Sequence, residues 1–289
     1  MNRYRQLLHQ FQRELQLLKY ADSTVRTYTD CLAIFLRAMN GKPNPLPLDE
    51  IKTFLLTIKN ANYHKQFTAT IHHFYSKVLK QPLTLHDIPY PRKTHYLPQI
   101  FSVAEVYRFL QAIPNLKQKT ALQLMYSCAL RISEVVNIQL HHVDGQRQLL
   151  LVKGAKGFKD RYVPIPLPTI AMLRQYYTQY RPSVYLFNGQ NAAQYDVRSI
   201  QQVFHRAKQA AGIIKKLTPH CLRHSRLTHL KEAGVDIHEL KEIAGHNNIK
   251  TTEIYLHLAK ETLVRRMAMA DQYLQSSMQN SKVLAPSTY

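Results

Sequence analysis

Acidic side chains are scarce in this sequence of 289 residues. Asp and Glu together number 18 against 39 Lys and Arg, which leaves a net charge of +21 before any of the 15 histidines is counted. Because 45% of the residues are hydrophobic and 20% are charged, the chain can build a core, and the excess charge is not that of a disordered basic tail. A folded protein this basic is typical of those that bind phosphate backbones or anionic membrane surfaces.

Cysteines and long apolar runs are also few. The chain has three widely spaced cysteines, Cys31, Cys128 and Cys221, and is long enough to fold without disulfide bonds. An odd number of cysteines in such a chain indicates a reducing cytoplasm. The first residues have neither the apolar core nor the small-residue cleavage site of a secretory signal. The longest apolar runs, such as 149–152, fall far below the roughly 18 residues that cross a bilayer. The sequence therefore excludes a membrane span and leaves surface attachment open.

The first 80 residues show the periodicity of four helices. Apolar residues recur at three- and four-residue steps, and we expect Ser23 to cap the second helix. The four stripes are Tyr4, Leu7, Leu8, Phe11, Leu15 and Leu18; Val25, Tyr28, Leu32 and Phe35; Ile51, Phe54, Leu55 and Ile58; and Phe67, Ile71, Phe74, Tyr75 and Val78. These patterns predict a helical domain over residues 1–80.

Prolines separate this domain from the rest of the chain. Residues 81–100 contain Pro82, Pro89, Pro91 and Pro98, which forbid a continuous helix, so we interpret the segment as a basic linker. Ser102 and Glu105 then form a capping box that opens a second domain. We expect that domain to cover residues 101–275 and to be followed by a disordered tail over residues 276–289.

The second domain is predicted to be mainly helical with a small antiparallel sheet, an α+β fold. Residues 149–152 and 162–165 are β-prone runs, and the basic, Gly-containing segment between them is typical of a hairpin tip. Val143 offers a third strand ahead of a turn. Helical patterns cover residues 167–180, 197–211, 219–233, 237–244 and 249 to about 274.

The segment from Thr218 to His224 carries the first candidate site residues. Pro219 suits the first turn of a helix, which places His220 and Arg223 on one face, where an imidazole and a guanidinium can share a phosphate. Taken alone, such a pair more often consists of solvated surface side chains, or its histidine is buried with its hydrogen bonds satisfied. His220 and His224 also have the spacing of a zinc pair, but the sequence supplies no ligands to complete the site.

Four further residues gain meaning only from their order in the chain. His246 follows a glycine in a tight turn that Asn248 can end by capping the next helix, and anions bind readily at such helix starts. Tyr255 lies in that next helix, Arg131 begins an earlier one, and Lys156 lies in the hairpin tip. Each would be unremarkable by itself, because most arginines and lysines are solvated and the chain has 18 tyrosines.

Together these segments resemble the tyrosine recombinases, the phage integrase family that includes the Xer and Cre enzymes. Residues 129–135 are similar to the family's Gly-Leu-Arg-x-Ser-Glu-Leu box, 155–161 to its Gly-Lys-Gly-x-Lys-x-Arg hairpin, and 220–224 to its His-x-Leu-Arg-His box. Gly-His at 245–246 and Thr-Thr-x-x-Tyr at 251–255 also fit. Ala129, Ala155 and Ala244 depart from the family pattern, and none of the three removes a chemical group.

The resemblance implies a site-specific recombinase that cleaves and rejoins double-stranded DNA through a 3′-phosphotyrosine and exchanges strands between two sites. It makes Tyr255 the nucleophile and His220 the candidate base. Arg131, Arg223 and His246 would hold the phosphate, and Lys156 would protonate the leaving 5′-oxygen. Glu134 is expected to orient Arg131 or a neighbouring histidine. We further expect Arg92, Lys93, Lys153, Lys159 and Arg161 to track the DNA backbone.

The same resemblance implies no cofactor and no metal, since the phosphotyrosine stores the bond energy, and no Walker loop or dinucleotide fingerprint is present. It also implies a homotetramer on DNA in a prokaryotic, nucleoid-associated setting. A C-terminal stripe of Leu263, Met267, Ala270 and Leu274 would dock on a neighbour or, equally well, on its own domain. The alternatives are a catalytically idle DNA-binding protein, a related tyrosine enzyme that relaxes or resolves DNA without exchange, and, far behind, an RNA-binding protein.

Overall fold

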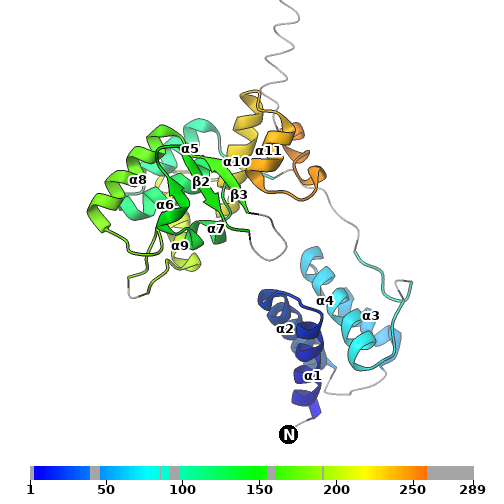
Figure 1. Cartoon of the computed structure of the whole chain (residues 1–289). Coiled ribbons are helices and arrows are strands. Elements are labelled where there is room, and N and C mark those ends of the chain that lie inside the picture. Colours follow the sequence, from blue (N-terminus) through cyan, green and yellow to red (C-terminus); the bar gives the residue numbers. More distant parts are fainter. Residues whose placement is uncertain are drawn as a thin grey trace, which may run out of the picture. The chain divides into compact units, whose positions relative to one another are not determined.

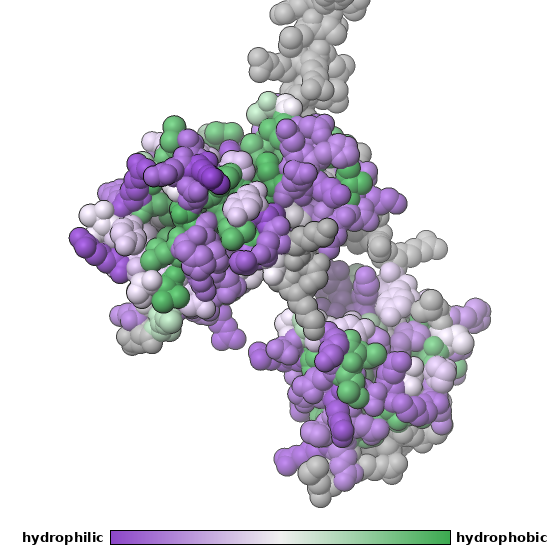
Figure 2. All heavy atoms as spheres, viewed as in Figure 1, coloured by the Kyte–Doolittle hydropathy of each residue, from purple (hydrophilic) through white to green (hydrophobic). Residues whose placement is uncertain are grey.

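The computed structural model describes residues 3–39, 46–84, 86–91, 98–154, 160–190 and 192–258. The chain divides into two compact units, Met1–His95 and Tyr96–Tyr289 (Figure 1). Hydrophilic side chains dominate the visible face of each unit (Figure 2), as the scarcity of apolar runs leads one to expect. None of the helices in the described parts of the chain is long and apolar enough to cross a membrane.

The first unit is helical. Its elements are α1 (Arg3–Leu17), α2 (Asp22–Ala38), α3 (Leu48–Leu56), α4 (Ala61–His73) and a π-helical turn, η1 (Phe74–Val78), that continues α4. The predicted stripes meet in one core, in which Phe54 packs edge-on against both Phe35 and Phe67. Aromatic pairs of this kind add about 0.5–1.5 kcal/mol to the burial itself.

The start of the second helix differs from the prediction, and the residues near both ends of the predicted linker have packing partners. Ser23 does not cap α2, because the helix begins one residue earlier, at Asp22, and Ala21 takes the N-cap position without a side-chain bond. Ile88 is buried in the core of the first unit. At the other end, the side chain of Gln99 accepts from the backbone of Lys216 in the second unit. Both ends of the segment interpreted as a linker therefore pack on the units that it joins.

The second unit is α-helical with one small sheet. It contains α5 (Val103–Gln111), α6 (Leu116–Ser127), α7 (Ile132–Asn137), η2 (Leu140–His142), β1 (Val143–Asp144), β2 (Leu149–Val152), β3 (Arg161–Pro164), α8 (Leu167–Tyr180), α9 (Val197–Ala210), α10 (Pro219–Glu232), α11 (Ile237–Ala244), η3 (Ile249–Thr251) and α12 (Ile254–Leu258). The capping box of Ser102 and Glu105 is present at α5. Fold class and most element positions thus match the sequence analysis.

The sheet is antiparallel in the order β1-β2-β3, with Val143 opposite Leu150 and Leu150 opposite Val163. Alternate residues of β2 face the main core, which also contains Phe101, Phe109 and Phe204. The expected continuous helix from residue 249 is wrong: a 3₁₀ turn precedes α12, and Thr252 is buried between them. The C-terminal stripe lies outside the described residues.

A separate small core positions the segment that bears Tyr255. Tyr255 packs with Ala129, Leu227, Leu240 and Ala244, which come from the loop before α7 and from helices α10 and α11. In Figure 1, α10 and α11 lie next to each other beyond the β3 edge of the sheet. This cluster brings four distant stretches of sequence to one place.

Candidate active site

Helix α10 supplies three polar side chains to the surroundings of Tyr255. Pro219 occupies its first turn, as predicted, and His220, Arg223 and His224 follow within the next five residues. Arg223 is 1% exposed, and its guanidinium donates to the carbonyls of Ala129 and Ala244 and lies 3.0 Å from Nε2 of His246. Burial, followed by the charge of Arg131, lowers the pKa of Arg223 to about 10, so the side chain remains a cation at neutral pH.

The hydroxyl of Tyr255 lies against an imidazole. Its oxygen is 2.9 Å from Nδ1 of His224, and its ring stacks on that of His246 with centroids 6.4 Å apart. His246 in turn has Nδ1 3.0 Å from the hydroxyl of Thr252 and Nε2 beside Arg223. The tight turn expected at Gly245 is present, since this residue is in the left-handed region with φ of 62°. Tyr255 itself is only 1% exposed.

The buried, cationic surroundings keep these groups neutral. Burial raises the pKa of Tyr255 to about 12, although the charges of Arg223 and Arg131 oppose the shift. Burial lowers the pKa of His224 to about 3, assisted by His220, Arg223 and His246. It also lowers the pKa of His246 to about 4, with Arg223 and Arg131 next in importance. Because both groups are neutral, the tautomer of His224 decides which of them donates in the bond between Tyr255 and His224.

Glu134 joins the arginines of the site. It accepts from the backbone N–H of Arg131 at 2.8 Å and from the guanidinium of Arg131 at 2.9 Å. The guanidinium of Arg161 binds both its oxygens, and Arg223 lies 3.9 Å away. Burial acts to raise the pKa of this carboxyl, but the bonds and charges of Arg161, Arg131 and Arg223 outweigh it, so the pKa is lowered. The expected contact of Glu134 with Arg131 is therefore present.

His220 lies at the exposed edge of the group. Its ring is edge-on to that of His224, with centroids 4.4 Å apart. Burial of the ring and the charges of Arg223 and Arg131 lower its pKa. The imidazole within hydrogen-bond distance of Tyr255 is that of His224, which sequence reasoning considered only as a zinc ligand. The signal for it was present in the His-x-Leu-Arg-His box, one helical turn after His220.

The structure brings together Arg131, His220, Arg223, His246 and Tyr255. Arg131 retains 27% exposure of its side chain, whereas Arg223 and Tyr255 are covered. Lys156 and Lys159 in the hairpin tip, and Arg92 and Lys93 in the linker, lie outside the described residues. Lys153 is described: it is exposed and pairs with Asp160 at 2.8 Å, across the base of the hairpin tip.

Arg161, which was expected to contact the DNA backbone, lies largely inside the protein. Its side chain is 9% exposed, both terminal nitrogens bind Glu134, and Nε donates to the carbonyl of Ile243. Three of the five N–H donors of this guanidinium are engaged inside the protein, and its low exposure leaves little of it accessible to an outside ligand. The sequence alone does not distinguish a solvated arginine from one that pairs with a buried carboxylate.

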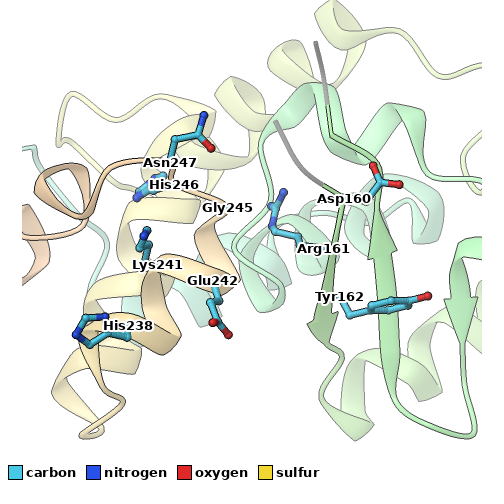
Figure 3. A pocket seen from close by; sticks show the side chains of 9 residues that line it. All are labelled: Asp160, Arg161, Tyr162, His238, Lys241, Glu242, Gly245, His246 and Asn247. Carbon is cyan, nitrogen blue, oxygen red and sulfur yellow. The ribbon is translucent and has the colours of Figure 1, made fainter. Parts of the chain in front are cut away.

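A hollow of about 720 Å³ adjoins the site between the base of the hairpin and α11 (Figure 3). Its lining combines the cations Arg161 and Lys241 with the carboxylates Asp160 and Glu242, and His238 and His246 add two imidazoles. Within the described ranges, no group of three or more His, Cys, Asp or Glu side chains is placed to hold a metal ion. The arrangement offers cationic and hydrogen-bonding groups around one phenol, a set suited to phosphate chemistry.

The low pKa values of the partly buried His224 and His246 predict that the second unit loses stability in acid. Their pKa values of about 3 and about 4 lie below the ordinary 6.5, so unfolding takes up protons between about pH 4 and pH 6.5, and stability falls as pH falls through that window. We expect the second unit to lose about 2–3 kcal/mol of unfolding free energy between pH 7 and pH 5 from these two groups, allowing for their partial exposure.

Urea unfolding at both pH values measures this loss. The variant with His224→Gln and His246→Gln keeps polar side chains but cannot titrate there, so it should show a much flatter pH dependence. An equal change of unfolding free energy with pH in the wild type and the double variant would contradict the assignment.

Comparison with known proteins identifies the family of the chain. The model of the phage integrase family matches residues 99–262, and that of the phage integrase N-terminal SAM-like domain matches residues 7–85. The putative integrase/recombinase y4qK of Sinorhizobium fredii is 31% identical over 253 residues, 85% of this chain and 82% of the relative. Tyrosine recombinase XerD of Oceanobacillus iheyensis is 31% identical over 268 residues, 84% of this chain and 90% of the relative.

Solved structures share the fold at lower identity. XerH recombinase bound to a palindromic difH substrate superposes with a TM-score of 0.70 at 19% identity, over 86% of this chain and 80% of that one. A lambda integrase dimer bound to a COC′ core site gives 0.72 at 16%, over 87% and 76%. Together with the two family models, these similarities establish that the chain belongs to the phage integrase family of tyrosine recombinases.

Proposed function

We propose that this protein is a site-specific DNA recombinase that cleaves and rejoins double-stranded DNA through a 3′-phosphotyrosine at Tyr255 and exchanges strands between two sites. Family membership supports site-specific recombination in general. The observation that carries the finer proposal is the cluster in which the Tyr255 hydroxyl, two imidazoles and the Arg223 guanidinium meet. XerH and lambda integrase, which share the fold, have been solved on their DNA sites, which supports DNA as the partner.

The proposed reaction is a transesterification. The Tyr255 oxygen attacks phosphorus, the bond to the 5′-oxygen breaks, the phenolic proton passes to a base, and the 5′-oxygen leaves as a hydroxyl after receiving a proton. Arg131, Arg223 and His246 stabilise the charge that grows on the non-bridging oxygens. His220 is the proposed base and Lys156 the proposed acid. Rejoining is the same reaction run backward with a hydroxyl from the other site.

Burial of the reacting groups means that the DNA-free arrangement is a resting one. Arg223 and Tyr255 are each 1% exposed, so a phosphate reaches them only after the segment around α12 has shifted. The shift separates the Tyr255 hydroxyl from His224, whose low pKa makes it a poor base in the resting state. A phosphodiester between Arg131 and Arg223 adds negative charge, which raises the pKa values of nearby imidazoles and favours proton transfer to His220.

The remaining parts of the proposal concern assembly and setting. A homotetramer on two DNA sites, possible exchange of the C-terminal stripe between protomers, and a cytoplasmic, nucleoid-associated location follow from the family resemblance. Protein groups carry every step of the proposed chemistry, and neither ATP nor a metal ion enters it.

Covalent trapping tests the proposal directly. The full-length protein is incubated with fragmented, nicked genomic DNA, denatured, and the protein-bound DNA is sequenced and the modified peptide identified. We expect a nicked duplex of defined sequence attached to the peptide that contains Tyr255. Failure to form any adduct, with DNA binding retained, would support the idle DNA-binding protein instead. Adducts without products of exchange between two such sites would support relaxation or resolution.

A further inference from the structure

Arg161 joins three parts of the site and has no task in the proposed reaction. It begins β3, and its guanidinium binds both oxygens of Glu134, at 2.9 and 3.0 Å. Its Nε donates to the carbonyl of Ile243, near the end of α11, at 2.9 Å. One side chain thereby connects the hairpin strand to α7 and to α11. Figure 3 shows it extending from the strand toward the turn at Gly245.

Each of these contacts leads to a residue proposed to hold the phosphate. Oε1 of Glu134 accepts from both Arg161 and Arg131, so the position of the carboxylate that orients Arg131 depends on Arg161. Ile243 is followed by Ala244, whose carbonyl accepts from Arg223, and by Gly245 and His246.

The turn at Gly245 packs directly on Arg161. A Cβ placed on Gly245 would lie 2.9 Å from Cδ of Arg161 and 2.9 Å from one of its terminal nitrogens. Real Cβ atoms do not approach other atoms so closely, so the glycine is needed for space as well as for its φ of 62°. The fit between backbone and guanidinium sets the distance of the His246 turn from the strand.

We propose that Arg161 is a positioning residue that holds Arg131 and the His246 turn at the separation that the scissile phosphate requires. This inference rests on the proposed function. A guanidinium suits the task because its planar fork makes two parallel bonds to Glu134 while its Nε binds the carbonyl of Ile243. A lysine would keep the charge and lose this geometry.

The test compares two forms of the nicked duplex recovered by covalent trapping. One carries the natural phosphodiester at the cleaved position, and the other carries a methylphosphonate, which is neutral and needs less cationic stabilisation in the transition state. We expect Arg161→Gln to form adduct about 100-fold more slowly than wild type on the phosphodiester, as displacement of a positioned group by about 1 Å does. The loss on the methylphosphonate should be much smaller.

Arg161→Lys should resemble Arg161→Gln rather than wild type. Arg147→Gln is the matched control, because Arg147 is 80% exposed in a turn of the same sheet and its removal changes the net charge equally. An equal loss by Arg161→Gln on both substrates would indicate a merely structural role and overturn the proposal. Rates equal to those of Arg147→Gln would overturn it too.

A second pair of variants leaves every charge in place. Gly245→Ala pushes on Arg161, whereas Gly212→Ala introduces the same side chain at a φ of 65° with nothing within 4 Å. We expect Gly245→Ala to reproduce the substrate-selective loss and Gly212→Ala to cleave both substrates at the wild-type rate. Equal rates for the two variants would refute the role of the contact. Tyr255→Phe separates this result from the proposed function, because an adduct on Tyr255→Phe refutes the nucleophile whatever Arg161 does.

Discussion

Tyr255→Phe is expected to form no covalent adduct with the trapped duplex while still binding it. The substitution removes one oxygen from a fully covered ring, so the packing with Leu227, Leu240 and Ala244 remains. No other described group has its hydroxyl placed among His224, His246 and Arg223, so we expect no side chain to replace the nucleophile. Adduct on denaturing gels and binding in a mobility-shift assay measure the two properties separately.

The substitution also has a calculable effect on stability. It removes the hydrogen-bond partner of Nδ1 of His224, and a buried polar atom left without a partner costs about 1–3 kcal/mol. Tyr177→Phe is the matched control, since Tyr177 is 50% exposed on α8 of the same unit and should lose neither adduct nor stability. Adduct formed by Tyr255→Phe at the wild-type rate would refute the assignment of the nucleophile.

Arg223→Lys is expected to slow adduct formation by about 100- to 1000-fold, the usual effect of removing one donor to a developing oxyanion. The guanidinium spans the carbonyls of Ala129 and Ala244 and the ring of His246, and an ammonium group cannot reach all three at once. Because lysine retains the positive charge, the experiment separates geometry from charge. Single-turnover rates at saturating DNA measure it without interference from affinity.

Arg226→Lys provides the control on the same helix. Arg226 lies less than one turn after Arg223, donates to the carbonyl of Ser127 and stacks over Tyr126, away from the cluster around Tyr255. It should cleave at close to the wild-type rate. Comparable losses in the two variants would mean that Arg223 acts through the stability of α10 rather than on the phosphate.

Local sequence signals predicted most of the fold because they report interactions within a few residues. The expected boundaries of α8 and α11 coincide with the structure, and the capping box at Ser102 begins α5. Helix periodicity and capping depend on neighbours three or four positions away, which a sequence displays directly. The errors concern helix limits: α2 begins at Asp22, ahead of the predicted cap at Ser23, and the helix predicted from residue 249 is interrupted at Thr252.

The candidate site divides in the same way. The order and spacing of Arg131, His220, Arg223, His246 and Tyr255 sufficed to identify the family, and the chemistry proposed for these residues stays a prediction. Sequence could not assign His224 to the Tyr255 hydroxyl, because the two are 31 residues apart and meet only through the packing of α10 against α12. The burial of Arg223 is a tertiary property of the same kind.

The sequence by itself determined three features of this protein: the excess of 39 basic over 18 acidic residues, the helical periodicities and the order of the motifs. Which basic residues remain exposed was decided only by the tertiary structure. Arg131 and Arg161 look alike in sequence, yet Glu134 binds both, and Arg131 retains three times the exposure of Arg161, 27% against 9%. The reason is physical: the guanidinium of Arg161 also binds the carbonyl of Ile243 on α11 and is covered there, whereas the guanidinium of Arg131 pairs with Glu134 and stays partly exposed.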